Sequence, residues 1–93
     1  MRIYEAMCVL RVEEEAFQRG KDAVREELKK LDANILKEED MGQRTLAYPI
    51  QNVNQAHYFY FVVEMEPEKA LQVEQSVKLF DDLLRFMMVR QES

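Results

Sequence analysis

The chain has 93 residues, of which 47% are hydrophobic and 33% are charged, with two glycines and two prolines. This length supports a single hydrophobic core, so we expect residues 1–93 to form one domain. The composition excludes a disordered or fibrous chain. No apolar run approaches the ~20 residues that span a bilayer, and the single cysteine suits a reducing compartment. We therefore expect a cytoplasmic protein without a membrane partner.

The formal net charge of −5 argues against general affinity for nucleic acid, because phosphate binding depends on Lys and Arg. The charges are unevenly distributed, however. Residues 13–40 and 64–82 each carry a net charge of −4, whereas the remaining residues carry +3 and have arginine as their only base. Arginine suits bidentate contacts with phosphates and base edges. The candidates for such a site, which could alternatively be scattered surface charges, are Arg2, Arg11, Arg44, Arg85 and Arg90.

The first predicted element is a strand over residues 2–10, because this stretch is rich in β-forming residues and almost continuously apolar. A helix follows, since residues 13–15 place three acids at its positive end. Its apolar stripe, which recurs at helical spacing, is Phe17, Val24, Leu28 and Leu31. We expect two ion pairs along its outer face, Glu15 with Arg19 and Glu26 with Lys30.

A second strand is predicted from Ile35 toward Gly42 and, after a bend, from Thr45 to Ile50. A glycine within a strand pattern indicates a bulge, and Pro49, which cannot donate a ladder hydrogen bond, indicates a sheet edge. Residues 51–55 are expected to form a polar loop. Residues 57–65, HYFYFVVEM, are β-branched and aromatic on both faces, which predicts a central strand.

A second helix is predicted to begin at residues 66–68, where a proline lies between two acids. Its apolar face comprises Ala70, Val73, Val77 and Phe80. Residues 83–90 form the fourth predicted strand. The order βαββαβ predicts an α+β, ferredoxin-like fold: a four-stranded antiparallel sheet with both helices on one face and the second and fourth strands at its edges.

Alternation along the strands assigns side chains to the two faces of this sheet. The set that faces the helices is Tyr4, Ala6, Cys8, Leu10, Phe59, Phe61, Val63 and Met65. The set on the opposite, open face is Ile3, Glu5, Met7, Val9, Tyr58, Tyr60, Val62, Met87 and Val89. An exposed apolar sheet face of this kind indicates a binding surface.

Residues suited to catalysis or metal binding are few. His57 is the only histidine and has no neighbouring cysteine, which favours a structural role over metal ligation. Cys8 occupies an inward strand position and is expected to be a small buried hydrophobe. The sequence has no Gly-rich phosphate loop. We therefore expect no enzymatic activity, no metal and no cofactor.

Two other interpretations remain open. A four-stranded sheet with central aromatics is also how RNA-recognition motifs stack bases. Residues 57–65 lack the glycine between aromatics that such motifs carry, and Tyr58 and Tyr60 could equally face a protein. The alternative function is a small dimeric ferredoxin-like enzyme or metabolite-binding domain that pairs through its open face and uses His57.

Four motifs stand in order along the chain: Met1-Arg2-x-Tyr4-Glu5, then Gly42-x-Arg44-x-Leu46-Ala47-Tyr48-Pro49-Ile50, then His57-Tyr58 with Val63-Glu64, and finally Asp82-x-x-Arg85-x-Met87-x-Val89-Arg90. Over essentially the whole chain they resemble the bacterial small-subunit (30S) ribosomal protein number six family. The resemblance implies a structural constituent of the small ribosomal subunit. It also implies cooperative binding to the central domain of small-subunit rRNA with ribosomal protein number eighteen, a small basic partner. We expect a monomer when the protein is isolated.

Carried over to this sequence, the resemblance implies an RNA-facing group at the ends of the first and fourth strands and beside Gly42: Arg2, Tyr4, Arg44, Arg85, Met87 and Arg90. Tyr4 is assigned inward by alternation, so its RNA contact would be partial, and Arg44 would face RNA, partner or both. The candidates for partner contact are Leu46, Ala47, Tyr48, Pro49, Ile50, Tyr58 and Tyr60. An edge strand with unpaired backbone groups can accept a partner strand there.

Overall fold

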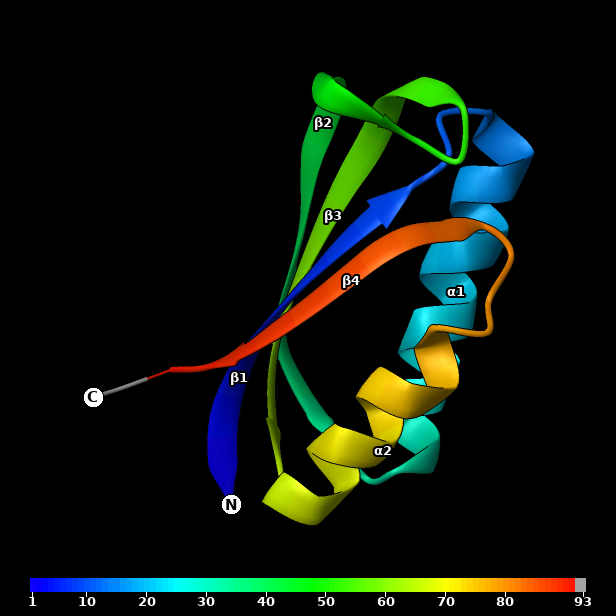
Figure 1. The fold of residues 1–93 in the computed structure, drawn as a ribbon. Helices are drawn as coiled ribbons and strands as arrows, with labels where there is room; N and C mark the ends of the chain where they lie inside the picture. The colour runs from blue at the N-terminus through cyan, green and yellow to red at the C-terminus, as the bar shows by residue number, and fades with distance from the viewer. Residues whose placement is uncertain (92–93) are drawn as a thin grey trace.

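The computed structural model describes residues 1–91. Its elements are β1 (Arg2–Leu10), α1 (Glu14–Lys30), β2 (Asn34–Ile50), β3 (Val53–Met65), α2 (Pro67–Val77) and β4 (Leu83–Arg90). The strands form one antiparallel sheet in the order β2-β3-β1-β4, and both helices cover the same face of it (Figure 1). The predicted α+β, ferredoxin-like fold is confirmed, with β2 and β4 at the sheet edges. Neither helix in the described part of the chain is long and apolar enough to cross a membrane.

The main core lies between the sheet and the two helices. It contains every side chain that alternation assigned to the helix-facing side, together with Phe17, Val24 and Leu28 of α1 and Ala70, Val73 and Val77 of α2. Cys8 is fully buried there, and burial raises the pKa of its thiol to about 12. The thiol therefore stays protonated at neutral pH and behaves as a small hydrophobe, as predicted.

The loop predicted over residues 51–55 is wrong, because only Gln51 and Asn52 separate β2 from β3. Both residues have positive φ, at 50° and 64°. Positive φ at both central positions is the geometry of the tight turn that matches the twist of two antiparallel strands. Residues 53–55 consequently belong to β3, and β2 and β3 form a long hairpin that reaches past the rest of the sheet (Figure 1).

The bulge predicted at Gly42 is present in β2. Pairing with β3 skips a residue between Asp40 and Gly42, and Gly42 has a φ of 86°. The Gly42 backbone N–H donates to Asp40 Oδ1 at 2.9 Å. Glycine adopts this left-handed backbone without steric cost, which explains its place in the strand.

Helix α2 ends at Val77, three residues before Phe80, which was expected on its apolar face. Phe80 still packs against the main core, but from the connection between α2 and β4. The apolar pattern of the sequence therefore identified a partly buried residue that packs on the core, but it overextended the helix.

Neither of the two ion pairs predicted along α1, Glu15 with Arg19 and Glu26 with Lys30, is formed within residues 1–91. Arg19 donates to both carboxylate oxygens of Asp82, at 3.0 and 3.2 Å, rather than pairing with Glu15. Arg25 donates to both oxygens of Glu38, at 3.0 and 2.6 Å. These two arginines therefore tie α1 to the sheet and its connections, because the fold brings distant carboxylates into the bidentate geometry that guanidinium prefers.

Candidate functional site

The sheet face turned away from the helices is apolar along its two central strands. Met7 of β1 lies in register between Tyr60 of β3 and Met87 of β4. Two residues further along β1, Val9 lies between Tyr58 and Arg85. No helix in the described chain covers this open face (Figure 1). Met87 and Val89 remain largely exposed on it. The open face predicted by alternation is therefore present, and no helix of residues 1–91 covers it.

One end of the open face is covered by residues 46–50, which we call the hairpin tip. The pairing of β2 with β3 jumps from Thr45 to Ile50, so the tip leaves the ladder. Leu46 and Ile50 pack against a second, smaller cluster of buried residues, Val9, Ala56 and Leu84. Val9 is for this reason only 2% exposed, although it lies on the open side of the sheet.

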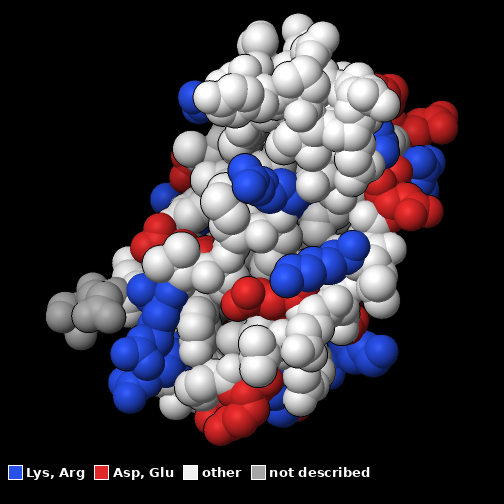
Figure 2. Space-filling model, in the orientation of Figure 1, with Lys and Arg blue, Asp and Glu red and all other residues white. Residues whose placement is uncertain are grey.

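The hairpin tip presents its remaining side chains to solvent. Tyr48 is 82% exposed, and Ala47 and Pro49 are exposed beside it. The tip and the open face enclose a hollow of about 210 Å³ lined by Val9, Leu46, Ala47, Tyr48, Ile50, Tyr58, Arg85 and Met87. The upper part of Figure 2, where Figure 1 places the end of the hairpin, is largely free of charged side chains. Most of the residues predicted for partner contact therefore meet in one place.

Two arginines flank Tyr58 on the open face. The Arg44 guanidinium carbon lies 6.0 Å from the centre of the Tyr58 ring, within reach of a cation–π contact. Arg85 lies on the other side, across Val9, and is exposed. Within residues 1–91 neither arginine forms an ion pair with an acid. The Arg44 guanidinium donates a hydrogen bond to the Met41 carbonyl at 3.4 Å. Neither guanidinium is neutralised by a carboxylate of the described residues, so both can contact an anionic ligand.

Of the other residues predicted to face RNA, Met87 lines the same hollow as Arg85, whereas the remaining three lie elsewhere. Arg90 pairs with Tyr4, and Arg2 lies two residues from Tyr4, so strand alternation places all three on the helix-facing side. Arg90 is five residues from Arg85, or roughly 17 Å along an extended strand. Lys and Arg side chains gather at the lower left of Figure 2, where Figure 1 places the start of β1 and the end of β4. The structure thus divides the predicted RNA-facing set into two groups.

Tyr4 belongs to the main core and is only 8% exposed. Little of its surface is available to a nucleic acid. Its position opposite Arg90 instead fixes the local backbone from which Arg2 and Arg90 project.

The open face also contains a polar pair that sequence reasoning did not find. The Tyr60 hydroxyl donates to Glu5 Oε1 at 2.6 Å, and this hydrogen bond to the carboxylate raises the pKa of Tyr60 to about 12. Tyr60 pairs with Met7 and is therefore diagonal to Glu5 across the β1–β3 ladder. A diagonal contact follows only from the strand register, which the sequence alone did not specify.

His57 contributes to the packing of the hairpin rather than to the open face. Its ring stacks on Phe17 of α1, with centroids 3.6 Å apart, and its Nε2 lies 2.6 Å from Asp40 Oδ1. The histidine side chain is 12% exposed. It thereby links α1 to the middle of β2. Residues 1–91 contain no group of three or more His, Cys, Asp or Glu side chains that could hold a metal ion.

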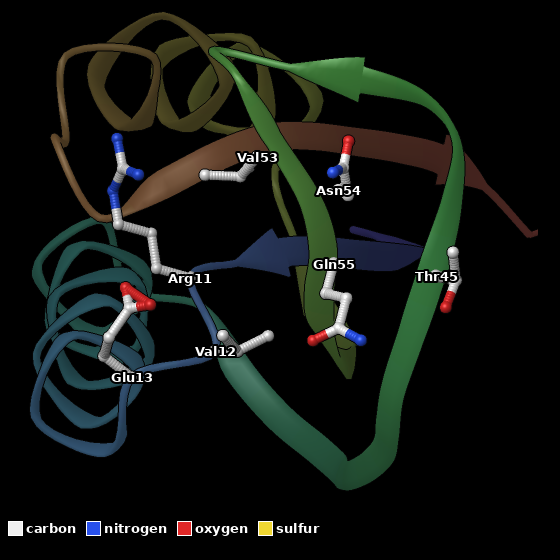
Figure 3. A pocket seen from close by; sticks show the side chains of 7 residues that line it. All are labelled: Arg11, Val12, Glu13, Thr45, Val53, Asn54 and Gln55. Atoms are coloured by element: carbon white, nitrogen blue, oxygen red, sulfur yellow. The ribbon is translucent and has the colours of Figure 1, made fainter.

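A separate hollow of about 390 Å³ lies beside the connection between β1 and α1. In Figure 3, Arg11 and Glu13 stand on one side of it and Thr45 of β2 on the other, with Asn54 and Gln55 of β3 between them. The Arg11 guanidinium already donates to the Asp81 carbonyl at 3.3 Å and to Gln51 Oε1 at 3.0 Å. With its arginine engaged and a carboxylate at its rim, this hollow is poorly suited to anions.

In the described part of the chain, an apolar sheet face without a helix over it, an exposed hairpin tip and two arginines outside ion pairs are features typical of ferredoxin-like proteins that dock onto other macromolecules. The comparison with known sequences agrees. The family model described as ribosomal protein S6 matches residues 3–90, and the chain belongs to this family. The family is a structural, non-enzymatic component of the small subunit of the cytoplasmic ribosome. The alternative of an enzyme that uses His57 is therefore wrong.

Relatives match the chain along its whole length. The chain is 39% identical over 93 residues to small ribosomal subunit protein bS6 of Treponema pallidum, with all of both chains covered. It is 36% identical over 92 residues to the bS6 protein of Treponema denticola, covering 99% of each. The crystal structure of 30S ribosomal protein S6 from Thermotoga maritima matches with a TM-score of 0.87 and 25% identity, over 97% of this chain and 87% of that one.

Proposed function

We propose that this chain is a structural constituent of the small ribosomal subunit that binds the central domain of small-subunit rRNA cooperatively with ribosomal protein number eighteen. Its relatives in Treponema are small ribosomal subunit proteins. The observation that carries the proposal is the composite surface of the open face and hairpin tip, with Arg44 and Arg85 beside it. This surface offers apolar area to a protein and guanidinium groups to an RNA at the same place.

The protein partner binds the hairpin tip and the adjoining tyrosines. Tyr48 is the exposed aromatic anchor of the tip, and large aromatic side chains of this kind dominate the energetics of many interfaces. Backbone groups on the outer side of β2 can pair with an extended segment of the partner. A basic partner is also attracted by the net charge of −5. The contact residues are Leu46, Ala47, Tyr48, Pro49, Ile50, Tyr58 and Tyr60.

The RNA contacts two arginine groups at the two ends of β4, along the outer edge of this strand. Arg85 on the open face forms one group, and Arg90 with Arg2 beside it on the helix-facing side forms the other. Arg44 and Met87 contribute where the RNA and the partner meet. Because so few cations oppose so many acids, the protein alone has low RNA affinity, and the basic partner supplies much of the phosphate neutralisation. This division explains why binding is cooperative.

The mechanism is preorganisation. The sheet fixes both arginine groups and the hairpin tip in one frame, so that little ordering entropy is lost when RNA and partner bind. No conformational change and no cofactor is required. The isolated protein is a monomer in this proposal, because the open face is reserved for a different chain.

The test is the affinity of a ternary complex that contains the protein, ribosomal protein eighteen and a central-domain rRNA fragment. Arg85→Ala is expected to weaken RNA binding by about 1 to 3 kcal/mol, since its guanidinium contacts phosphate or a base edge. The matched control is Lys78→Ala, which removes an exposed cation at the end of α2, on the other side of the sheet. If the two variants bind RNA equally well, Arg85 is not part of the RNA site.

A further inference from the structure

Glu5 lies near the middle of the open face, among apolar side chains. Its cross-strand neighbours are Val62 of β3 and Val89 of β4. Ile3 and Met7 precede and follow it on the same side of β1. Glu5 is half-buried and lines a hollow of about 300 Å³ with Met7, Tyr60, Met87 and Val89. A carboxylate in such surroundings is unexpected for a surface whose only role is apolar contact.

The Glu5 carboxylate has no cationic partner within residues 1–91. Its hydrogen bond comes from the Tyr60 hydroxyl, at 2.6 Å. Lys37, which pairs with Val62 on the far side of β3, is engaged with Glu39 at 3.1 Å. The raised pKa of Tyr60, about 12, is the expected response of a phenol whose hydroxyl donates a hydrogen bond to a carboxylate.

Charge along the open face is polarised. Arg44 and Arg85 lie at the end beside the hairpin tip. Glu5 lies near the middle with Glu39, which pairs with Tyr60 and is engaged by Lys37. Glu64, which pairs with Ile3, lies toward the other end. An RNA that approached this acidic end would bring phosphates against carboxylates. The acidic end is therefore suited to a protein with positive charge.

A partner that covers this face must compensate Glu5. An ionised carboxylate accepts several hydrogen bonds, and Tyr60 supplies one of them. If a partner removes water from the other hydrogen-bonding positions of the Glu5 carboxylate and offers no donor in its place, the complex carries a large desolvation cost. A purely apolar partner surface is therefore disfavoured. A lysine or arginine avoids the cost. Its aliphatic stem can pack on Met7, Met87 and Val89 while its charged head reaches the carboxylate.

We propose that Glu5 and Tyr60 form the recognition centre for one lysine or arginine side chain of the basic protein that covers the open face, with the stem of that side chain in the hollow between β1 and β4. The inference rests on the proposed function and specifies the chemistry by which the partner is selected. Tyr60 positions the carboxylate by donating to one oxygen, which leaves the other oxygen directed to the incoming cation.

The experiment compares Glu5→Gln with wild type in binding to ribosomal protein eighteen in the presence of the central-domain rRNA fragment. Gln keeps the shape of the side chain and can accept the Tyr60 hydrogen bond, but it removes the charge. Partner affinity is expected to fall at least tenfold and to become less dependent on salt. Glu74→Gln, which removes the same charge from α2, is the matched control and is expected to change affinity less than twofold. Far-UV circular dichroism and urea unfolding verify that both variants fold.

The partner's cation is located by a double-mutant cycle. Each lysine and arginine of the partner is replaced by methionine and tested against wild type and Glu5→Gln. One replacement is expected to weaken binding to wild type about tenfold and to have no further effect on Glu5→Gln. Tyr60→Phe, which retains the charge, is expected to weaken binding less than Glu5→Gln does.

Three results would overturn the inference. If Glu5→Gln binds the partner as tightly as wild type, the carboxylate does not recognise a cation, while the proposed function stands. If Glu5→Gln instead tightens the complex, the face is covered by RNA or by an apolar surface. If wild type itself forms no complex with the partner and the rRNA, the proposed function fails, and the inference fails with it.

Discussion

At the scale of single residues, Gly20 of α1 lies where the helix passes close to Leu10 of β1 and to Asp82. A Cβ at this position would lie 2.5 Å from Leu10 Cδ2 and 3.2 Å from Asp82 Cβ. Leu10 is fully buried, so its methyl group has no free space to move into. Glycine is therefore needed here for packing, although alanine is the better helix former.

We expect Gly20→Ala to lower the free energy of unfolding by about 1 to 2 kcal/mol, because overpacking outweighs the ~1 kcal/mol gain in helix propensity. Urea unfolding at neutral pH measures the change. The double variant with Leu10→Val is expected to lose less stability than the sum of the single variants, since the smaller side chain relieves the clash. A stabilised Gly20→Ala protein would show that the helix can shift away from the sheet.

Glu38 of β2 provides a pH-dependent contribution to stability. Its bidentate hydrogen bond with Arg25 lowers the pKa of the carboxyl below its ordinary value of 4.5. A lowered folded-state pKa stabilises the fold above pH 4.5, and this contribution is lost as the pH falls through the folded-state pKa. Both side chains are partly exposed, so the contribution is about 0.5 kcal/mol.

Wild type and Glu38→Gln are therefore expected to differ by about 0.5 kcal/mol in unfolding free energy at pH 7 and to converge near pH 3. Urea titrations at the two pH values measure the difference. A gap between the two proteins that stays constant with pH would mean that the Glu38 charge is not responsible.

At the scale of elements, the hairpin tip is the part of the surface that we expect to contribute most to partner affinity. Tyr48→Ala should weaken the complex with the basic partner about tenfold, because a large aromatic contact is lost, while the unfolding free energy stays nearly unchanged. The matched control is Leu79→Ala, since Leu79 is also 82% exposed but lies in the connection between α2 and β4. Isothermal titration calorimetry compares the two variants, and equal affinities would relocate the interface.

Most of the elements could be predicted because their signals are local. Helical spacing of apolar residues gave α1, acids around Pro67 gave the start of α2, and dense β-branched and aromatic residues gave the central strands. The turn between β2 and β3 was missed because Gln51 and Asn52 are not the usual Asn-Gly pair. The pairing of Arg19 with Glu15 was predicted wrongly because its true partner, Asp82, is brought close only by the tertiary fold. The Arg25–Glu38 pair was missed for the same reason.

The sequence predicted which residues belong to the site but not how these residues are arranged in space. Alternation placed Met7, Tyr58 and Met87 on the open face correctly. It could not show that the hairpin tip folds over Val9, because the buried cluster with Ala56 and Leu84 joins three strands. Arg85 and Arg90 are separated because they lie near opposite ends of β4. The sequence motif that contains both residues does not reveal this separation. The roles assigned to these residues stay predictions.

At the scale of the whole molecule, the acidic body and the few free arginines determine how assembly proceeds. The acids are concentrated on the helices and their connections, and several of the cations there are held in ion pairs. Arg44 and Arg85 are free of such pairs in the described residues. A molecule of this kind attracts a basic protein more readily than an RNA. That residues 1–93 form a single domain also stays a prediction, and Glu92 and Ser93 lie outside the described residues.

The most direct test of the account is a hydroxyl-radical footprint on central-domain rRNA, measured with this protein alone, with the basic partner alone, and with both. We expect little protection by this protein alone and a distinct protected region when both proteins are present, which Arg85→Ala reduces and Lys78→Ala leaves unchanged. Full protection by this protein without the partner, or no additional protection when both are present, would contradict cooperative docking through the open face and hairpin tip.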